Sequence, residues 1–172
     1  MHQVLLSLGA NLGSPLHTLS KAIELIRQHL LTDVMVSPFY ETAPVGVTDQ
    51  PAFINVAVMG TSSAHPQEIH DICKAIEAEL GRQHRERWHE REIDIDVILV
   101  GDVIYDIDDV HIPHPRMHER MFVLVPSCDL LADAVCPRSH KKLSELLEEC
   151  TDTVSKPRRV ANSESFGNSV IR

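Results

Sequence analysis

Two aspartates, Asp94 and Asp96, lie one residue apart in the segment REIDIDVILVG at residues 91–101. Apolar residues alternate with them, which predicts a β-strand. Because successive side chains of a strand point to opposite faces, the two carboxylates share one face, roughly 7 Å apart. Carboxylate oxygens are ligands that Mg²⁺ prefers, and Mg²⁺ often bridges carboxylates to substrate phosphates. The pair therefore predicts a magnesium site, and the alternative is a solvated polar face of a half-buried strand.

Four arginines precede this strand in the segment RQHRERWHER at residues 82–91, although the chain has a net charge of -9. They are Arg82, Arg85, Arg87 and Arg91. Guanidinium groups bind phosphate oxygens in pairs, so this cluster beside the carboxylates predicts a phosphate-binding loop. The alternative is a charged helix end compensated by Glu86 and Glu90. Trp88, the single tryptophan, is interpreted as part of a lid rather than of the core.

Two further segments carry candidate binding residues. In FINVAV, residues 53–58, Phe53 and Asn55 share one strand face. Asparagine is a poor strand residue that is costly to bury unpaired, so Asn55 either makes a structural hydrogen bond or binds the edge of a flat heterocycle stacked on Phe53. In HIPHPRMHERMFVL, residues 111–124, basic side chains precede Phe122, namely His114, Arg116, His118 and Arg120. With eleven histidines in the chain, a transition-metal binder stays open as an alternative.

The elements that position these residues follow from the periodicity of apolar side chains. The pattern predicts strands at 3–8, 33–42, 53–61 and 91–101, and helices at 14–30 and 66–80. The order strand, helix, strand, strand, helix, strand is typical of the ferredoxin-like, split βαβ plan, an α+β fold with a mainly antiparallel sheet. A hairpin near 103–105 and short helices within 115–134 and 143–150 are expected to follow. Residues 1–150 are predicted to be one domain and residues 151–172 a mobile tail.

Composition excludes several classes of function. The acidic balance disfavours a general nucleic-acid surface, which needs a broad excess of Lys and Arg. No apolar run is long enough for a membrane span, and the start of the chain lacks a secretory pattern, so a cytoplasmic location is expected. The four cysteines form no C-x-x-C pair and are expected to be reduced thiols. Neither a Walker motif nor a G-x-S-x-G motif is present.

Four segments together resemble the 6-hydroxymethyl-7,8-dihydropterin pyrophosphokinase family of folate biosynthesis. They are LLSLGANLG, FYETAPVG with QPAFINVAV, GRQHRERWHEREIDIDVILVG, and IPHPRMHERMFVLVP. The resemblance extends from Val4 to Pro137. It implies a Mg²⁺-dependent enzyme that transfers pyrophosphate from ATP to the hydroxymethyl group of the pterin and releases AMP. Pterin and ATP are then the expected binding partners.

The resemblance also implies a role for individual residues. Two Mg²⁺ ions would be held by Asp94 and Asp96, which with Arg82 and Arg91 form the catalytic set. The residues implied to contact ATP, one of them in the closing loop, are Arg82, Arg91, Trp88, His114 and Arg120. The pterin pocket is formed by Thr42, Val45, Phe53, Asn55 and Phe122. Glu77 matches an acidic position of the family for which the resemblance implies no definite role.

One segment departs from the family pattern. Where the family usually has Trp-Gly-Pro-Arg, this chain has Trp88-His89-Glu90-Arg91. The closing loop therefore loses a stiff Gly-Pro bend and gains a carboxylate near the phosphates. This departure motivates the alternative of a non-catalytic pterin- or nucleotide-binding paralogue.

Overall fold

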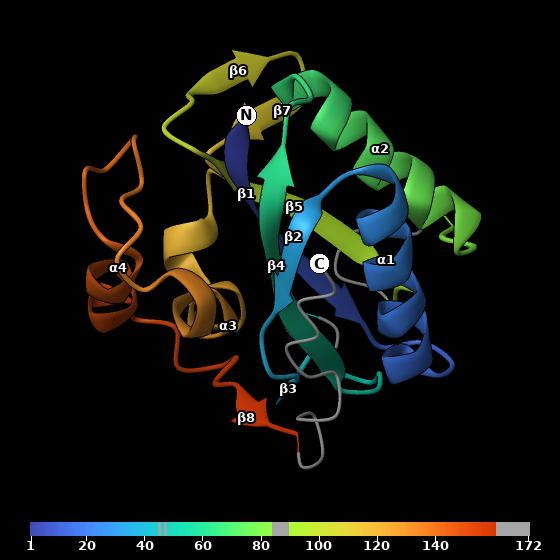
Figure 1. Ribbon diagram of the computed structural model, residues 1–172. Coiled ribbons are helices and arrows are strands. Elements are labelled where there is room, and N and C mark those ends of the chain that lie inside the picture. The colour runs from blue at the N-terminus through green and yellow to red at the C-terminus, as the bar shows by residue number, and fades with distance from the viewer. Residues whose placement is uncertain (45, 47, 84–89, 161–172) are drawn as a thin grey trace.

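The structure is a computed structural model that describes the whole chain except residues 45, 47, 84–89 and 161–172 (Figure 1). In chain order the elements are β1 (His2–Ala10), α1 (Pro15–His29), β2 (Thr32–Val36), β3 (Tyr40–Thr42), β4 (Phe53–Ser62), α2 (Pro66–Glu79), β5 (Asp94–Val100), β6 (Tyr105–Ile107), β7 (Val110–Ile112), the 3-10 helix η1 (Met117–Glu119), α3 (Met121–Leu131), α4 (Leu143–Glu149) and β8 (Arg158–Arg159). In this described part, every helix is too short or too polar to span a bilayer.

The main sheet is antiparallel and has the strand order β5-β1-β4-β3-β8, with β2 also paired to β4. Its register brings the predicted site residues to one level. Gly9 of β1 pairs with Asn55 of β4 on one side and with Asp94 of β5 on the other. Since neighbouring strands are about 4.8 Å apart, Asn55 and Asp94 lie roughly 10 Å from each other across β1.

Helices cover both faces of this sheet (Figure 1). On one face, α1 and α2 bury apolar residues such as Ile26 and Ile69 against Leu6 and Leu8 of β1. On the other face, α3 and α4 pack on Leu5, Ala57 and Ile98, among others. The ferredoxin-like α+β prediction is confirmed, and α3 and α4 are an additional layer. Ala57 shares its face of β4 with Phe53 and Asn55, so these two residues lie on the α3 side of the sheet.

Local chemistry explains where the helices begin and end. α1 starts at Pro15 after Ser14, as predicted, but the Ser14 side chain makes no capping hydrogen bond. α2 starts with a capping box between His65 and Glu68. It is followed by Gly81 with φ of 86°, a left-handed conformation that favours glycine.

Three predictions about strands were wrong. The predicted strand at 91–101 is β5, which begins only at Asp94. The predicted strand at 33–42 is two strands, β2 and β3, separated at Ser37 and Pro38. Proline has no N–H for a ladder, and the Ser37 hydroxyl accepts a hydrogen bond from the Ala57 N–H at 2.9 Å. The predicted hairpin near 103–105 lies at β6 and β7 instead, where Asp108 takes the left-handed turn conformation with φ of 52°.

The predicted mobile tail also needs correction in its described part. Residues 158 and 159 form β8, which pairs with β3 at the edge of the sheet. Ser155 is 1% exposed, and Val160 packs against the core. Residues 151–160 therefore belong to the fold, while residues 161–172 lie outside the described residues. The pairing is non-local, so it left no apolar period in the sequence.

Candidate active site

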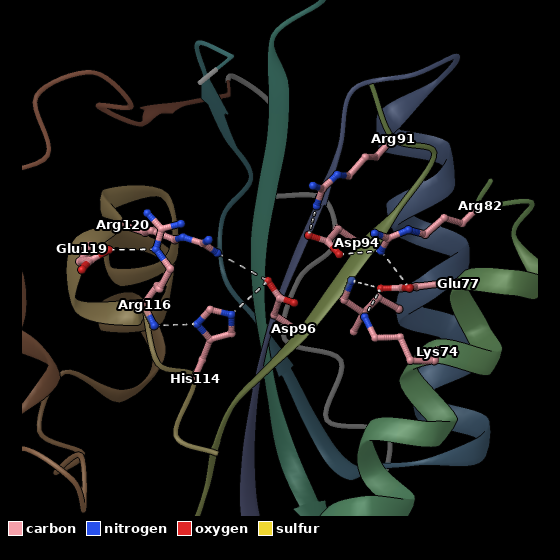
Figure 2. A network of polar contacts seen from close by, with 11 residues as sticks. Lys74, Glu77, Arg82, Arg91, Asp94, Asp96, His114, Arg116, Glu119 and Arg120 are labelled. Atoms are coloured by element: carbon pink, nitrogen blue, oxygen red, sulfur yellow. Dashed lines mark hydrogen bonds and ion pairs between the residues drawn. The ribbon is translucent and has the colours of Figure 1, made fainter. Parts of the chain in front are cut away.

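Asp94 lies at the start of β5 and is held by two arginines (Figure 2). Its Oδ1 is 2.6 Å from Arg82 Nη1, and its Oδ2 is 2.8 Å from Arg91 Nη1. Burial alone would raise the pKa of Asp94, but the charges of Arg91 and Arg82 bring that pKa below its usual range. Asp94 is therefore a carboxylate whose charge is compensated by the loop arginines.

Asp96 lies on the same face of β5 but points to different partners (Figure 2). Its Oδ2 is 3.9 Å from His114 Nε2 and 4.0 Å from Arg120 Nη1, both longer than a hydrogen bond. Burial and then the negative charge of Asp94 raise the pKa of Asp96 to about 7. The negative charge of Asp96 is thus much less compensated than that of Asp94.

His114 and Arg120 reach Asp96 from the segment between β7 and α3. The Arg116 N–H donates to His114 Nδ1 at 3.1 Å, which leaves the imidazole proton on Nε2, toward Asp96. Burial and then the positive charge of Arg120 lower the pKa of His114 to about 4, so the ring is neutral at pH 7. The Arg120 guanidinium also lies 5.7 Å from the centre of the Phe122 ring. His114 and Arg120 therefore both face Asp96, and Arg120 also contacts Phe122.

The other basic residues of this segment turn away from Asp96. Arg116 Nε pairs with Glu119 Oε2 at 3.0 Å. His118 Nε2 lies 3.7 Å from Glu119 Oε1. Both side chains are partly exposed and lie beside Glu119 at the surface.

Glu77 of α2 has a definite place beneath the arginine pair (Figure 2). Its Oε1 accepts the Ile95 N–H at 2.7 Å and lies 3.0 Å from Lys74 Nζ. Its Oε2 lies 2.9 Å from Arg82 Nη1. Glu77 is 4% exposed. Through its bond to Ile95, it joins the end of α2 to the backbone of β5 between the two aspartates. The family resemblance indicated Glu77 without a definite role, and these contacts make Glu77 a positioning residue.

Replacing Glu77 with Ala is expected to lower the free energy of unfolding by about 3 kcal/mol, because two cations and a backbone N–H lose a buried acceptor. Chemical denaturation measures this loss. Glu79→Ala, two residues along α2 and exposed, is the matched control and should change stability by less than about 0.5 kcal/mol. Equal losses in the two variants would contradict the positioning role.

Asn11 holds the end of the arginine loop and was not predicted as a site residue. Its Oδ1 accepts the Arg91 N–H at 2.9 Å, and its own N–H donates to the Arg91 carbonyl at 3.2 Å. Its Nδ2 donates to Gln50 Oε1 and to the Pro51 carbonyl, both at 3.0 Å. The one available signal was an asparagine between two glycines in GANLG. Asn11 fixes the backbone of Arg91 against the loop before β4.

Thr42 and Asn55 are two of the four described residues of the predicted pterin pocket, and both are buried. Asn55 Nδ2 donates to Thr42 Oγ1 at 2.7 Å. A Cβ atom at Gly9 would lie 2.9 Å from Asn55 Oδ1, so glycine is required for this close approach. Phe53 begins β4 beside them and is partly exposed. The amide orientation of Asn55 is thereby fixed on the α3 face of the sheet.

A cavity of about 250 Å³ lies beside Asp96. It is lined by, among others, Lys74, Asp96, His111, Ile112, His114 and Pro115. Burial alone would lower the pKa of Lys74, but Glu77, Asp94 and Asp96 together raise it, so Lys74 is a cation at neutral pH. The sequence did not single out Lys74, because a lysine on a helix carries no motif.

Several predicted residues lie outside the described residues. These are Val45 of the pterin pocket, Trp88 of the closing loop, and the loop residues Arg85, Arg87 and His89. Their predicted roles stay predictions.

The carboxylates at the start of β5 have the chemistry of a magnesium site. Asp94 and Asp96 present hard carboxylate oxygens from one rigid strand, and the Arg120 guanidinium lies 4.0 Å from Asp96, against 2.6 Å and 2.8 Å for the two arginines at Asp94. Among the described residues, no three His, Cys, Asp or Glu side chains converge as a metal cage. Mg²⁺ usually takes one or two protein carboxylates and completes its shell with water and substrate phosphates. Two aspartates therefore fit Mg²⁺ bound together with a nucleotide, whereas a histidine-based transition-metal cage finds no site in this part of the chain.

Comparison with known proteins identifies the family. A family model described as 7,8-dihydro-6-hydroxymethylpterin-pyrophosphokinase (HPPK) matches residues 5–132. The 2-amino-4-hydroxy-6-hydroxymethyldihydropteridine pyrophosphokinase of Bacillus subtilis is 40% identical over 126 residues, which cover 73% of this chain and 75% of that protein. Its namesake from Haemophilus influenzae is 36% identical over 151 residues, or 86% and 92% of the two chains. A mitochondrial folate synthesis bifunctional protein of Arabidopsis thaliana is 40% identical over 134 residues, 78% of this chain.

Two kinds of relative are longer than this chain, which spans only 24% of the Arabidopsis protein. A crystal structure described as HPPK-DHPS in complex with substrates has a TM-score of 0.67 at 12% identity and covers 86% of this chain and 43% of its own. The Plasmodium falciparum HPPK-DHPS with pteroate has a TM-score of 0.70 at 12% identity, with 86% and 42% covered. These structures show the fold. By its sequence, the chain belongs to the 7,8-dihydro-6-hydroxymethylpterin-pyrophosphokinase family, which transfers a pyrophosphoryl group from ATP to hydroxymethyldihydropterin in folate synthesis.

Proposed function

We propose that this chain performs the family reaction at the Asp94–Asp96 end of β5, with Mg²⁺, and releases AMP and the pterin diphosphate. The observation that carries the proposal is the placement of two unequal carboxylates on one strand face. Arg82 and Arg91 lie on one side of them, and His114 and Arg120 lie on the other. The buried amide of Asn55 is one strand away across β1.

Asp94 and Asp96 are proposed to hold two Mg²⁺ ions. When bound, these ions would neutralise the triphosphate and make the β-phosphorus easier to attack. Phosphoryl-type transfer passes through a loose transition state, so it needs positioning and charge neutralisation more than covalent help. Arg82 and Arg91 are proposed to release the Asp94 carboxylate and bind phosphate oxygens instead, because the paired N–H donors of a guanidinium group suit either anion.

The nucleotide is proposed to occupy the cavity beside Asp96. Lys74 supplies a cation there, and neutral His114 supplies an Nε2–H donor. Arg120 approaches Asp96 from the opposite side to Arg82, so phosphates near the carboxylates meet positive charge from both sides. Trp88 and the rest of the loop at 84–89 are proposed to close over the nucleotide, which would exclude water.

The pterin is proposed to lie on the α3 side of the sheet. Asn55 and Thr42 bind its edge, and Phe53 and Phe122 stack on its ring, with Val45 adjacent. The spacing of roughly 10 Å between Asn55 and Asp94 leaves room for the ring between them. The hydroxymethyl oxygen then faces the metal end of β5 and attacks the β-phosphorus in line.

A product assay tests the proposed function. With ATP, Mg²⁺ and 6-hydroxymethyl-7,8-dihydropterin, the purified protein should form AMP and pterin diphosphate in equal amounts, as measured by chromatography. Omission of the pterin should stop AMP formation. ADP or inorganic phosphate as the product would contradict pyrophosphoryl transfer. Calorimetric binding of ATP and pterin without AMP formation would instead identify a non-catalytic paralogue, the alternative that Glu90 and the altered loop motivate.

The cellular setting stays a prediction. A cytoplasmic location is expected from the sequence, whereas two of the plant relatives are named as mitochondrial. Several structural neighbours carry HPPK and DHPS in one chain. No nucleic-acid or membrane partner is proposed for this chain, whose sequence is acidic.

A further inference from the structure

Residues 151–160, here called the C-terminal strap, connect two parts of the substrate site. They follow α4, pass beneath α3 and end as β8 beside β3 (Figure 1). The strap lies beyond residues 5–132, the part of the chain that the family model matches. The contacts of the strap therefore lie outside the part of the chain that defines the family match.

One end of the strap is bonded to the start of α3 through Asp152. Its Oδ2 accepts the Met121 N–H at 3.2 Å, while its Oδ1 accepts the N–H groups of Val154 and Ser155, both at 3.1 Å. The buried Ser155 hydroxyl also donates to Oδ2. α3 has no side-chain cap of its own, so Asp152 satisfies a free N–H at the first residue of the helix.

Met121 lies between two residues proposed to act on the substrates. Arg120, before it, has its Nη1 4.0 Å from Asp96 Oδ2. Phe122, after it, lies under the same guanidinium at 5.7 Å. The Asp152 carboxylate binds the Met121 N–H, and it therefore fixes the backbone from which the side chains of Arg120 and Phe122 extend.

The other end of the strap is bonded to β3. Arg158 and Arg159 pair with Glu41 and Tyr40, and the Val160 N–H donates to the Phe39 carbonyl at 2.9 Å. β3 also carries Thr42, the hydrogen-bond acceptor of Asn55 Nδ2. The strap thus reaches the opposite side of the proposed pterin pocket from Phe122.

A direct bond between β3 and α3 runs parallel to the strap. Tyr40 Oη donates to Asp129 Oδ2 at 2.5 Å. Burial and then this hydrogen bond raise the pKa of Tyr40 to about 12, so the phenol keeps its proton. Among the described residues, the strap and the Tyr40–Asp129 bond thus both connect β3 with α3, and the strap also binds the backbone at Met121.

We propose that the C-terminal strap sets the separation of β3 and α3 around the pterin, and that Asp152 is a positioning residue for Arg120 and Phe122. The inference rests on the proposed function. The inference extends the proposed function, because it assigns part of the affinity for the pterin to residues outside the family match. A strap that loses either connection lets α3 move relative to β3, and the pterin is then held less tightly.

Asp152→Asn separates the two connections of this side chain. A single carbonyl oxygen can still accept from Val154 and Ser155, so the local turn is kept. The amide NH₂ then faces the Met121 N–H, and the bond to α3 is lost. The KM for the pterin is expected to rise about tenfold, because a charge-assisted bond to α3 is removed and Phe122 shifts with the helix. The KM for ATP and kcat are expected to change less, by up to about threefold, because Arg120 is one of several cations proposed to meet the phosphates. Asp133→Asn, an exposed aspartate paired with Lys142, is the control.

Val160→Pro tests the other end independently, because it removes the N–H that bonds to Phe39 while Val160→Thr keeps it. The proline variant should show the same selective rise in the pterin KM, and the threonine variant should not. The inference is overturned if the pterin KM is unchanged in both Asp152→Asn and Val160→Pro. It is also overturned if kcat falls and both KM values rise to the same extent. An inactive wild-type protein instead overturns the proposed function, so the two failures are distinguishable.

Discussion

Asp96→Ala is expected to lower kcat by at least about a thousandfold, because the carboxylate that holds a metal against the triphosphate is lost. The protein should still fold. Asp96 lies 3.9 Å and 4.0 Å from His114 and Arg120, so its removal breaks no close ion pair to them. Rapid-quench measurement of AMP in a single turnover, at saturating ATP and pterin, separates this loss from slow product release.

Asp102→Ala is the matched control for Asp96→Ala. Asp102 follows the other end of β5 and is exposed, so kcat should stay within about twofold. Asp96→Asn should be nearly as inactive as the alanine variant, since a neutral amide is a weak magnesium ligand. A kcat for Asp96→Ala within tenfold of wild type would remove Asp96 from the metal site.

Arg91→Ala is expected to reduce kcat/KM for ATP by about a hundred- to a thousandfold, the usual loss when one preorganised donor to a developing negative charge is removed. Arg91 Nη1 lies 2.8 Å from Asp94 Oδ2, at the point where phosphates are proposed to enter. Its backbone is held by Asn11, and this bond survives the substitution. The loss therefore reports the guanidinium and not the loop.

Arg91→Lys keeps the charge but loses the planar fork, so it should recover only part of the lost kcat/KM. Arg27→Ala, an exposed arginine at the end of α1, controls for loss of positive charge alone. Steady-state kinetics with ATP varied and the pterin saturating measure both. A kcat/KM for Arg91→Ala within about fivefold of wild type would show that Arg91 serves only to bind Asp94.

The sequence predicted those parts of the fold that depend on local chemistry. The apolar periods of α1 and α2 and the glycine after α2 are local signals, and the structure has both helices there. β8 depends on a distant partner, because it pairs with β3, and such pairing leaves no mark in a short window of sequence. The break between β2 and β3 has both kinds of cause: Ser37 bonds to the distant Ala57, whereas Pro38 was a local signal that the prediction did not use.

The site divides in the same way. Asp94 and Asp96 were identified because their spacing alone places them on one strand face. Asn11 was not, because its bond to the Arg91 N–H joins residues 80 positions apart. Asp152 and Met121 are 31 positions apart, in a segment without any apolar period. A motif can therefore indicate the residues that bind ligands, whereas the residues that position them depend on the fold.

The most direct test of the central claim is a crystal structure with a non-hydrolysable ATP analogue and Mn²⁺ in place of Mg²⁺, because manganese is located by anomalous scattering. We predict metal peaks about 2.2 Å from carboxylate oxygens of both Asp94 and Asp96. Arg82 and Arg91 should then contact phosphate oxygens. A bound nucleotide with no metal at either carboxylate, and with both arginines still paired to Asp94, would contradict the account.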